Sequence, residues 1–131
     1  MYVNMYAGNP TAGGTDGTLV SSMGTLTSPI SAVVPAETKK VITCAVRCQD
    51  GYTADVVYIT PYTRSGSSYS VGSDFIEVSE DGTNWVSDTA IMLMSVGSTN
   101  KLFYVRISGG TTGGADDTGA LRCYAEVEAN E

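Results

Sequence analysis

The stretch that decides the fold is ALRCYAEVE, residues Ala120–Glu128, near the end of the chain. Its apolar and polar residues alternate with a period of two, the pattern of a β-strand with one buried face and one solvated face. The apolar side holds Leu121, Cys123, Ala125 and Val127, and the other side holds Arg122, Tyr124, Glu126 and Glu128. This segment therefore predicts a half-buried terminal strand.

Further strand-like segments, rich in β-branched and aromatic residues, precede it from position 40 onward. They are Val41–Cys48, Val56–Tyr62, Phe75–Ser79, Ala90–Val96 and Leu102–Ile107. Turn signals such as Asp50–Gly51 and Glu80–Thr83 separate them, and no long window shows a helical stripe. This rhythm predicts an all-β fold, an antiparallel β-sandwich of immunoglobulin-like architecture.

Two of these segments have little alternation. Val56–Tyr62, VVYITPY, is nearly continuous in apolar and aromatic residues, which is typical of a central strand, with Pro61 at an edge or bulge. The period of Ala90–Val96, AIMLMSV, is ambiguous, but its seven residues are short for a helix, so we expect a buried strand.

Residues 1–39 differ from residues 40–131, which we expect to form the sandwich core. They are rich in glycine, serine and threonine and read as an N-terminal arm. Met1–Tyr6 and Pro29–Val34 carry enough apolar residues for edge strands. Each segment could complete the chain's own sandwich or that of a neighbour, and the sequence leaves both pairings open.

Composition limits the partners. The 131 residues suit one domain, and the net charge of −7 argues against nucleic acid, whose binding depends on neutralising phosphates. No apolar run is long enough for a membrane-spanning helix, so we expect a soluble protein with no membrane partner. Met1–Tyr6 has no secretion signal, which predicts synthesis in a cytoplasm.

The residue types also limit the chemistry. Histidine is absent, which removes the usual base for serine and cysteine nucleophiles, so we expect no enzyme activity. The three cysteines, Cys44, Cys48 and Cys123, read as reduced apolar residues rather than as a disulfide framework or a zinc site. No cofactor is expected.

A pattern T-x-G-G-x-D-x-T occurs twice, at Thr11–Thr18 and Thr111–Thr118. Its carboxylates Asp16, Asp116 and Asp117 suggest calcium loops, because Ca²⁺ prefers carboxylate and carbonyl oxygens. Calcium needs six or more oxygens, however, and two copies far apart do not supply them. Two glycine loops without metal are therefore the favoured interpretation.

The segment FIEVSEDGTNW, residues 75–85, resembles the hairpin of discoidin-like sugar-binding modules and of tail-fibre and adhesin domains. That resemblance implies a strand, a tight Asp-Gly turn and an aromatic residue that folds back over the sheet. Trp85, with Tyr62 and Tyr69, is then a candidate platform for stacking on carbohydrate. The alternative is that Trp85 packs against the core or a sheet edge.

The whole chain is similar in style to small virion proteins of tailed bacteriophages. The resemblance rests on the arm YAGNPTAGGTDGTLVSS, residues 6–22, on the acidic charge and on the closing LFYVR, residues 102–106, with the glycine loop and strand that follow. It implies a structural or capsid-decorating protein that forms homo-oligomers, contacts other virion proteins and is located in the virion. We expect the homo-oligomers to form through the amino-terminal arm and the sheet edges. The second hypothesis is a carbohydrate-binding β-sandwich of the adhesin or tail-fibre type.

Overall fold

The computed structural model describes residues 3–22, 38–65, 68–72, 76–108 and 119–129. The described residues form nine β-strands, and none of them belongs to a helix long and apolar enough to cross a membrane. The strands are β1 (Val3–Ala7), β2 (Thr18–Ser22), β3 (Lys39–Cys48), β4 (Tyr52–Ser65), β5 (Ser68–Val71), β6 (Ile76–Ser79), β7 (Ile91–Val96), β8 (Lys101–Ser108) and β9 (Gly119–Ala129).

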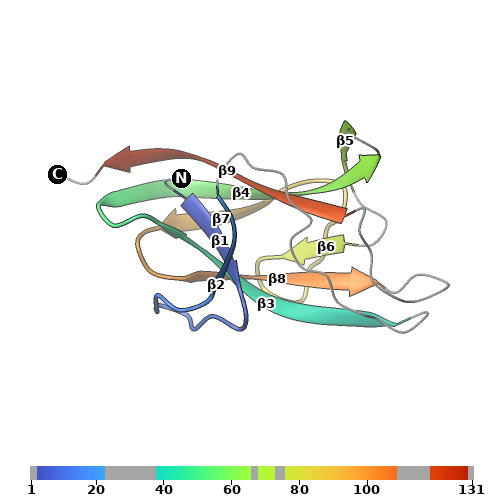
Figure 1. Cartoon of the computed structure of the whole chain (residues 1–131), viewed down its shortest axis with the longest axis horizontal. Helices are drawn as coiled ribbons and strands as arrows, with labels where there is room; N and C mark the ends of the chain where they lie inside the picture. Colours follow the sequence, from blue (N-terminus) through green and yellow to red (C-terminus); the bar gives the residue numbers. More distant parts are fainter. Residues whose placement is uncertain (1–2, 23–37, 66–67, 73–75, 109–118, 130–131) are drawn as a thin grey trace.

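The strands form two antiparallel sheets that pack face to face (Figure 1). In the described part of the chain, one sheet has five strands in the order β2-β1-β3-β8-β6. In the other, β9 pairs with β4 from Tyr52 to Thr63. On β4, residues Ala54–Ile59 pair with β7 and residues Tyr62–Ser65 pair with β5. Because a strand has only two edges and β9 takes one of them, β7 and β5 share the other edge of β4. The predicted all-β, two-sheet architecture is confirmed.

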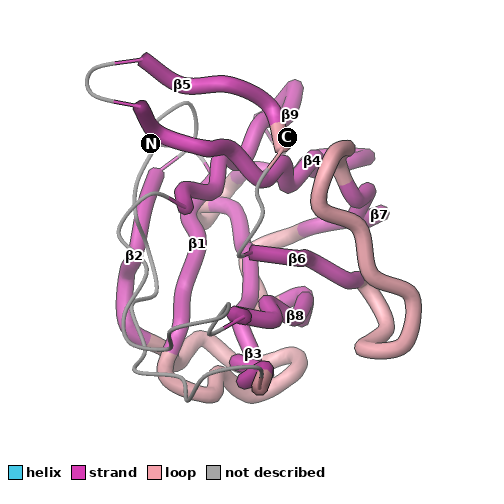
Figure 2. The backbone as a smooth tube through the Cα atoms, turned by 90° about the vertical axis from the view of Figure 1, so that its right-hand side faces the viewer, coloured by secondary structure: helices cyan, strands magenta, loops and turns pink. Residues whose placement is uncertain are grey.

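The core lies between the sheets, which Figure 2 shows from the end of the molecule. Along the strands whose side chains are described, alternate residues point into it, apart from the irregularities in β4 and β7. Its largest fully buried side chains are Phe103, Met5, Ile59, Leu93 and Leu121. The apolar face predicted for Ala120–Glu128 is confirmed, because Leu121, Cys123 and Ala125 are all buried.

A tight turn takes the chain from one sheet to the other between β3 and β4. The Tyr52 amide donates to the Gln49 carbonyl at 3.1 Å, and Gly51 has a φ of 89°, a value that side chains disfavour. The sheets are joined at the same end, where the Cys48 amide donates to the Gly97 carbonyl at 2.7 Å. The predicted turn at Asp50–Gly51 is confirmed, and it connects two layers.

The amino-terminal segment pairs within its own chain. Val3–Ala7 forms β1, with Val3 opposite Cys48 and Tyr6 opposite Ala45. The edge position expected for Met1–Tyr6 is wrong, because β1 lies between β2 and β3. Pro29–Val34, the second segment expected at an edge, lies outside the described residues. The sequence patterns missed β2, TLVSS, which shows little alternation, and β5, SYSV, which alternates but is only four residues long.

The expectation of a fully buried strand at Ala90–Val96 is wrong. The strand exists as Ile91–Val96, but only Ile91, Leu93 and Val96 are buried, while Met92 and Met94 are 51% and 56% exposed. Two outward residues, Met94 and Ser95, stand in succession because Ser95 adopts a left-handed φ of 55°. The left-handed residue changes the phase of the alternation.

The three cysteines are free and buried, as their apolar positions predicted. Burial disfavours the charged thiolate, and it raises the pKa of Cys44 to about 12 and that of Cys123 to about 11. Cys48 shifts in the same direction for the same reason. Their chemistry in the folded protein is that of small apolar side chains.

Candidate functional site

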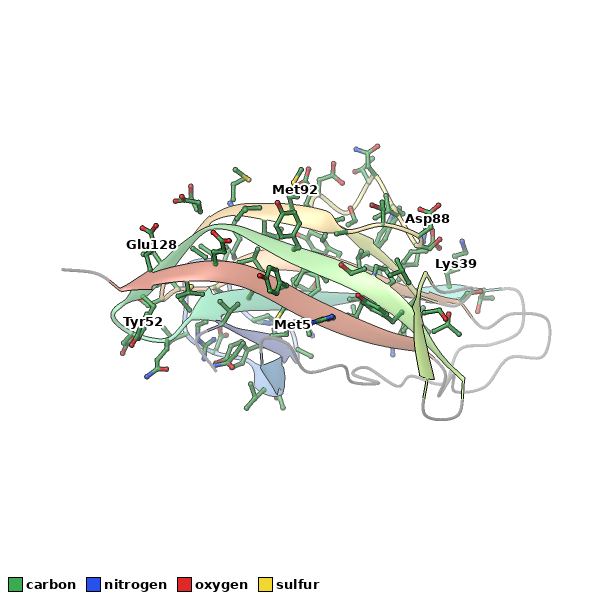
Figure 3. All side chains as sticks on the ribbon, turned by 90° about the horizontal axis from the view of Figure 1, so that it is seen from above. Met5, Lys39, Tyr52, Asp88, Met92 and Glu128 are labelled. Carbon is green, nitrogen blue, oxygen red and sulfur yellow. The ribbon has the colours of Figure 1, made fainter. Side chains whose placement is uncertain are left out.

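The outer face of the four-stranded sheet carries exposed aromatic and methionine side chains. In β4, Val57 and Ile59 point into the core, so Tyr58 and its alternate neighbours point outward. Tyr58 is 37% exposed and Tyr124 is 52% exposed. We call the surface formed by Tyr58, Tyr62, Tyr124, Met92 and Met94 the tyrosine–methionine face. Figure 3 looks onto it from outside, with β4 between β9 and β7 and with Met92 labelled.

Strand register aligns these side chains in a row. Tyr58 is directly opposite Tyr124 in β9 and directly opposite Met92 in β7. Directly opposed residues of antiparallel strands hold their Cβ atoms about 5 Å apart, so neighbouring side chains in the row pack against each other. Tyr124, Tyr58 and Met92 therefore form one continuous ridge across three strands.

A β-bulge shapes the surface on one side of this row. Two residues of β4, Asp55 and Val56, lie between Ala54 and Val57, while β9 has one residue between their partners Val127 and Ala125. The single opposing residue is Glu126. The extra residue brings Asp55 to the outer face beside Glu126, where strict alternation would have placed only one outward residue.

The surface beside the bulge is an acidic hollow of about 330 Å³. Tyr58 and Tyr124 form its border with the row. Its remaining lining residues are Thr53, Asp55, Val56, Glu126 and Glu128. The three carboxylates have no basic side chain among these lining residues, so this end of the face attracts positive charge.

The surface on the other side of the row holds a positive charge. A second hollow, of about 380 Å³, is lined by Thr60, Tyr62, Ala90 and Arg122, again with Tyr58 and Tyr124. Arg122 lies opposite Thr60. Its Nε is shielded from solvent and has no hydrogen-bond partner among the residues described. The tyrosine–methionine face therefore has an acidic end and a basic end.

The three predicted stacking residues do not lie together. Tyr62 belongs to the tyrosine–methionine face. Tyr69 is in β5, and its side chain is not among those that the structure describes. Trp85 lies against the other sheet, where the Arg106 guanidinium carbon is 4.5 Å from the centre of its ring. A sugar on that face of the indole would have to displace the guanidinium.

Arg106 also belongs to an ion-pair cluster on the five-stranded sheet. Glu77 accepts hydrogen bonds from Arg106 Nη2 at 2.8 Å and from Lys39 Nζ at 2.9 Å. The hydrogen bonds from Arg106, and then those from Lys39, hold the pKa of Glu77 below its ordinary value. This cluster joins β3, β6 and β8 across the sheet and fixes the guanidinium above Trp85.

The first of the two glycine loops is anchored around Asn100. This buried side chain donates from Nδ2 to the carbonyls of Thr11 and Asp16 and to Asp16 Oδ1. Its own oxygen accepts from Arg47 Nη1 at 2.7 Å. Asp16 also accepts from the amide and hydroxyl of Thr11, and these bonds, the amide's first, lower the pKa of Asp16.

Both Asp16 oxygens thus already have donors. Asp116 and Asp117, the other expected calcium ligands, lie outside the described residues. Within the described ranges, no group of three or more acidic or cysteine residues is placed to hold a metal ion.

Asp81 shapes the turn after β6. Its carboxylate accepts from the amides of Thr83 and Asn84, at 2.8 and 2.9 Å, and from the Ser79 hydroxyl at 2.9 Å. These bonds, led by the Asn84 amide, hold the pKa of Asp81 well below its ordinary value. The backbone then returns so that Val86 bridges to Val78. Asp81 therefore has a structural part in this turn.

The sequence patterns had assigned Arg122, Tyr124 and Glu126 to one side of a strand, but they gave no reason to join them to Tyr58 or Met92. That connection depends on the register of β9 and β7 on β4. Comparisons with protein-family models, with curated proteins and with solved structures found no match.

Proposed function

We propose that this chain is a non-enzymatic structural or decorating protein of a bacteriophage or prophage virion, acting through homo-oligomeric protein–protein interfaces. One observation carries the assembly part of the proposal: the row of exposed Tyr124, Tyr58 and Met92 on the tyrosine–methionine face. Contiguous apolar surface of this kind marks interaction sites in soluble proteins. Tyrosine and methionine are also enriched in protein interfaces.

The shape of this surface supports binding to another protein. The two hollows beside the row open to solvent on a three-stranded surface, and tyrosine side chains form their common border. Small-molecule sites in proteins are usually concave and enclose most of the ligand. A broad face with an apolar centre and charged ends is instead typical of a macromolecular contact.

The virion part of the proposal is supported by sequence style. It rests on the resemblance of residues 6–22 and 102–106 to virion proteins, and on the net charge of −7, which suits a subunit kept soluble at high copy number. We further propose that the sandwich is immunoglobulin-like, supported by two antiparallel sheets whose strands are connected across the layers. The protein would then be located in the virion, in contact with other virion proteins.

Carbohydrate binding is the second candidate, and one observation favours it. Tyr58, Tyr62 and Tyr124 lie on the same face, and the carboxylates of Asp55 and Glu126 lie beside them. Aromatic rings can stack on the apolar face of a sugar while carboxylates accept hydrogen bonds from its hydroxyl groups.

Light scattering and sedimentation of the full chain test the proposal, over about 1 to 200 µM because weak association depends on concentration. We expect reversible association that Tyr124→Ser weakens. Val41→Ser is the matched control, since Val41 is also 52% exposed but lies on the other sheet. A wild-type protein that stays monomeric throughout, and binds a soluble oligosaccharide saturably by calorimetry, would replace assembly with the second candidate.

A further inference from the structure

The tyrosine–methionine face is complementary to a copy of itself. Along β9, Arg122 and Glu126 lie two residues to either side of Tyr124. Their side chains point to the same face, because residues two apart along a strand share a face. Arg122 lines the basic hollow and Glu126 lines the acidic hollow. A rotation that exchanges the two ends of this face therefore places opposite charges against each other.

One rotation does this while packing two sheets face to face. A two-fold axis that lies between the sheets, along the row Tyr124, Tyr58 and Met92, places β9 over β9 and β4 over β4 in antiparallel directions. Each residue of the row then meets its own copy, as residues on the axis of an isologous interface do. An axis parallel to the strands would instead place β9 over β7 and leave Arg122 without a carboxylate.

We infer that two copies of this chain form a dimer about the axis along this row, with Arg122 of each copy paired with Glu126 of the other. The inference rests on the proposed homo-oligomeric function and gives it an interface and a symmetry. Arg122 has no carboxylate partner among the described residues of its own chain. The second copy supplies one through Glu126, with Asp55 beside it.

The other outward positions fit the same arrangement. Met94 and Ala90 lie two residues to either side of Met92, so the long exposed side chain of Met94 meets the small Ala90 of the other copy. Val56 of one copy likewise meets Thr60 of the other. Within one copy, Val56 lies opposite Met94 and Thr60 lies opposite Arg122. Packed sheets lie about 10 Å apart, a gap that arginine and glutamate fill from opposite sides.

The size of the face is typical of a weak, transient interface. The face is formed by β4, β9 and β7, which have 14, 11 and 6 residues. At about 3.3 Å per residue and about 4.8 Å between strands, they make a face of roughly 500 Å² per copy. Two copies then bury about 1,000 Å², the lower limit for a specific interface. We therefore expect a reversible dimer with a dissociation constant on the order of 10 µM.

Charge reversal tests the pairing. Arg122→Glu and Glu126→Arg should each weaken self-association of the full chain by about 30-fold or more, because two-fold symmetry applies each reversal twice. An equimolar mixture of the two variants should form a heterodimer, since both pairs are then complementary again. Lys101→Glu makes the same charge change as Arg122→Glu, but at an exposed position of the five-stranded sheet, and should leave the affinity unchanged. Thermal unfolding of each variant verifies that it is folded.

The outcomes separate this inference from the proposed function. Two variants that are monomeric alone and dimeric when mixed support the pairing. A wild-type oligomer that both single variants leave intact, or a mixture no stronger than its components, overturns this interface while homo-oligomeric assembly through another surface stands. A wild-type chain that is monomeric at about 200 µM, well above the expected dissociation constant, overturns both.

Discussion

Replacing Asn100 with alanine removes the amide that joins the loop between β1 and β2 to the rest of the five-stranded sheet. Asn100 is 5% exposed, and its amide group donates to Thr11 and Asp16 and accepts from Arg47. The two N–H groups and the oxygen of this amide count as three hydrogen bonds. Each contributes about 1 kcal/mol to stability, and the bond from the charged Arg47 contributes more. The expected loss of unfolding free energy is about 3 kcal/mol.

Urea denaturation followed by circular dichroism measures this loss. Asn84→Ala is the matched control, because the Asn84 amide donates to Asp81 in an exposed turn and its loss should be much smaller. Hydrogen exchange should also quicken at the Gly13 amide, which donates to the Asn100 carbonyl at 3.1 Å. A loss from Asn100→Ala no greater than that from Asn84→Ala would refute the anchoring role.

Three further experiments test the charges, the core and the buried thiols. The pKa of Glu77 is depressed, so its ion pairs stabilise the fold above about pH 4.3, and this stability is lost as pH falls through the folded pKa. In acid titrations, the difference in unfolding free energy between Glu77→Gln and wild type should therefore decrease as pH decreases. Phe103→Ala should cost about 3–5 kcal/mol in urea unfolding, and Val41→Ala very little; equal costs would contradict the assigned core. Cys44 and Cys123, whose pKa values are raised to about 12 and about 11, should react with a disulfide reagent at about pH 8 only after unfolding, and rapid native reaction would contradict their burial.

The segments with strict alternation could be predicted from sequence because one face of each is buried. Ala120–Glu128 is the clearest case, and β9 covers it as Gly119–Ala129. The inward positions Cys44 and Cys48 of β3 follow the same rule. Edge strands such as β2 were missed, since a strand with one neighbour and polar residues needs no regular apolar pattern.

The candidate site could be predicted only in part. VVYITPY was correctly interpreted as a central strand, but its aromatic residues do not tell whether another sheet covers the outer face. The phase change in β7 depends on the left-handed Ser95, which an apolar run does not reveal. The row itself depends on long-range register, because Tyr58, Met92 and Tyr124 are far apart in sequence and meet only when β7 and β9 pair with β4.

The most direct measurement of the central claim is methionine oxidation by peroxide in the unmodified protein as a function of its concentration. Met92 and Met94 are 51% and 56% exposed in one copy, whereas Met5 is 2% exposed and serves as an internal reference that stays protected. If two copies cover the tyrosine–methionine face, oxidation of Met92 and Met94 should slow in step with the dimer fraction, with half the effect near the dissociation constant of about 10 µM. Oxidation rates at Met92 and Met94 that stay constant while the protein dimerises would contradict it.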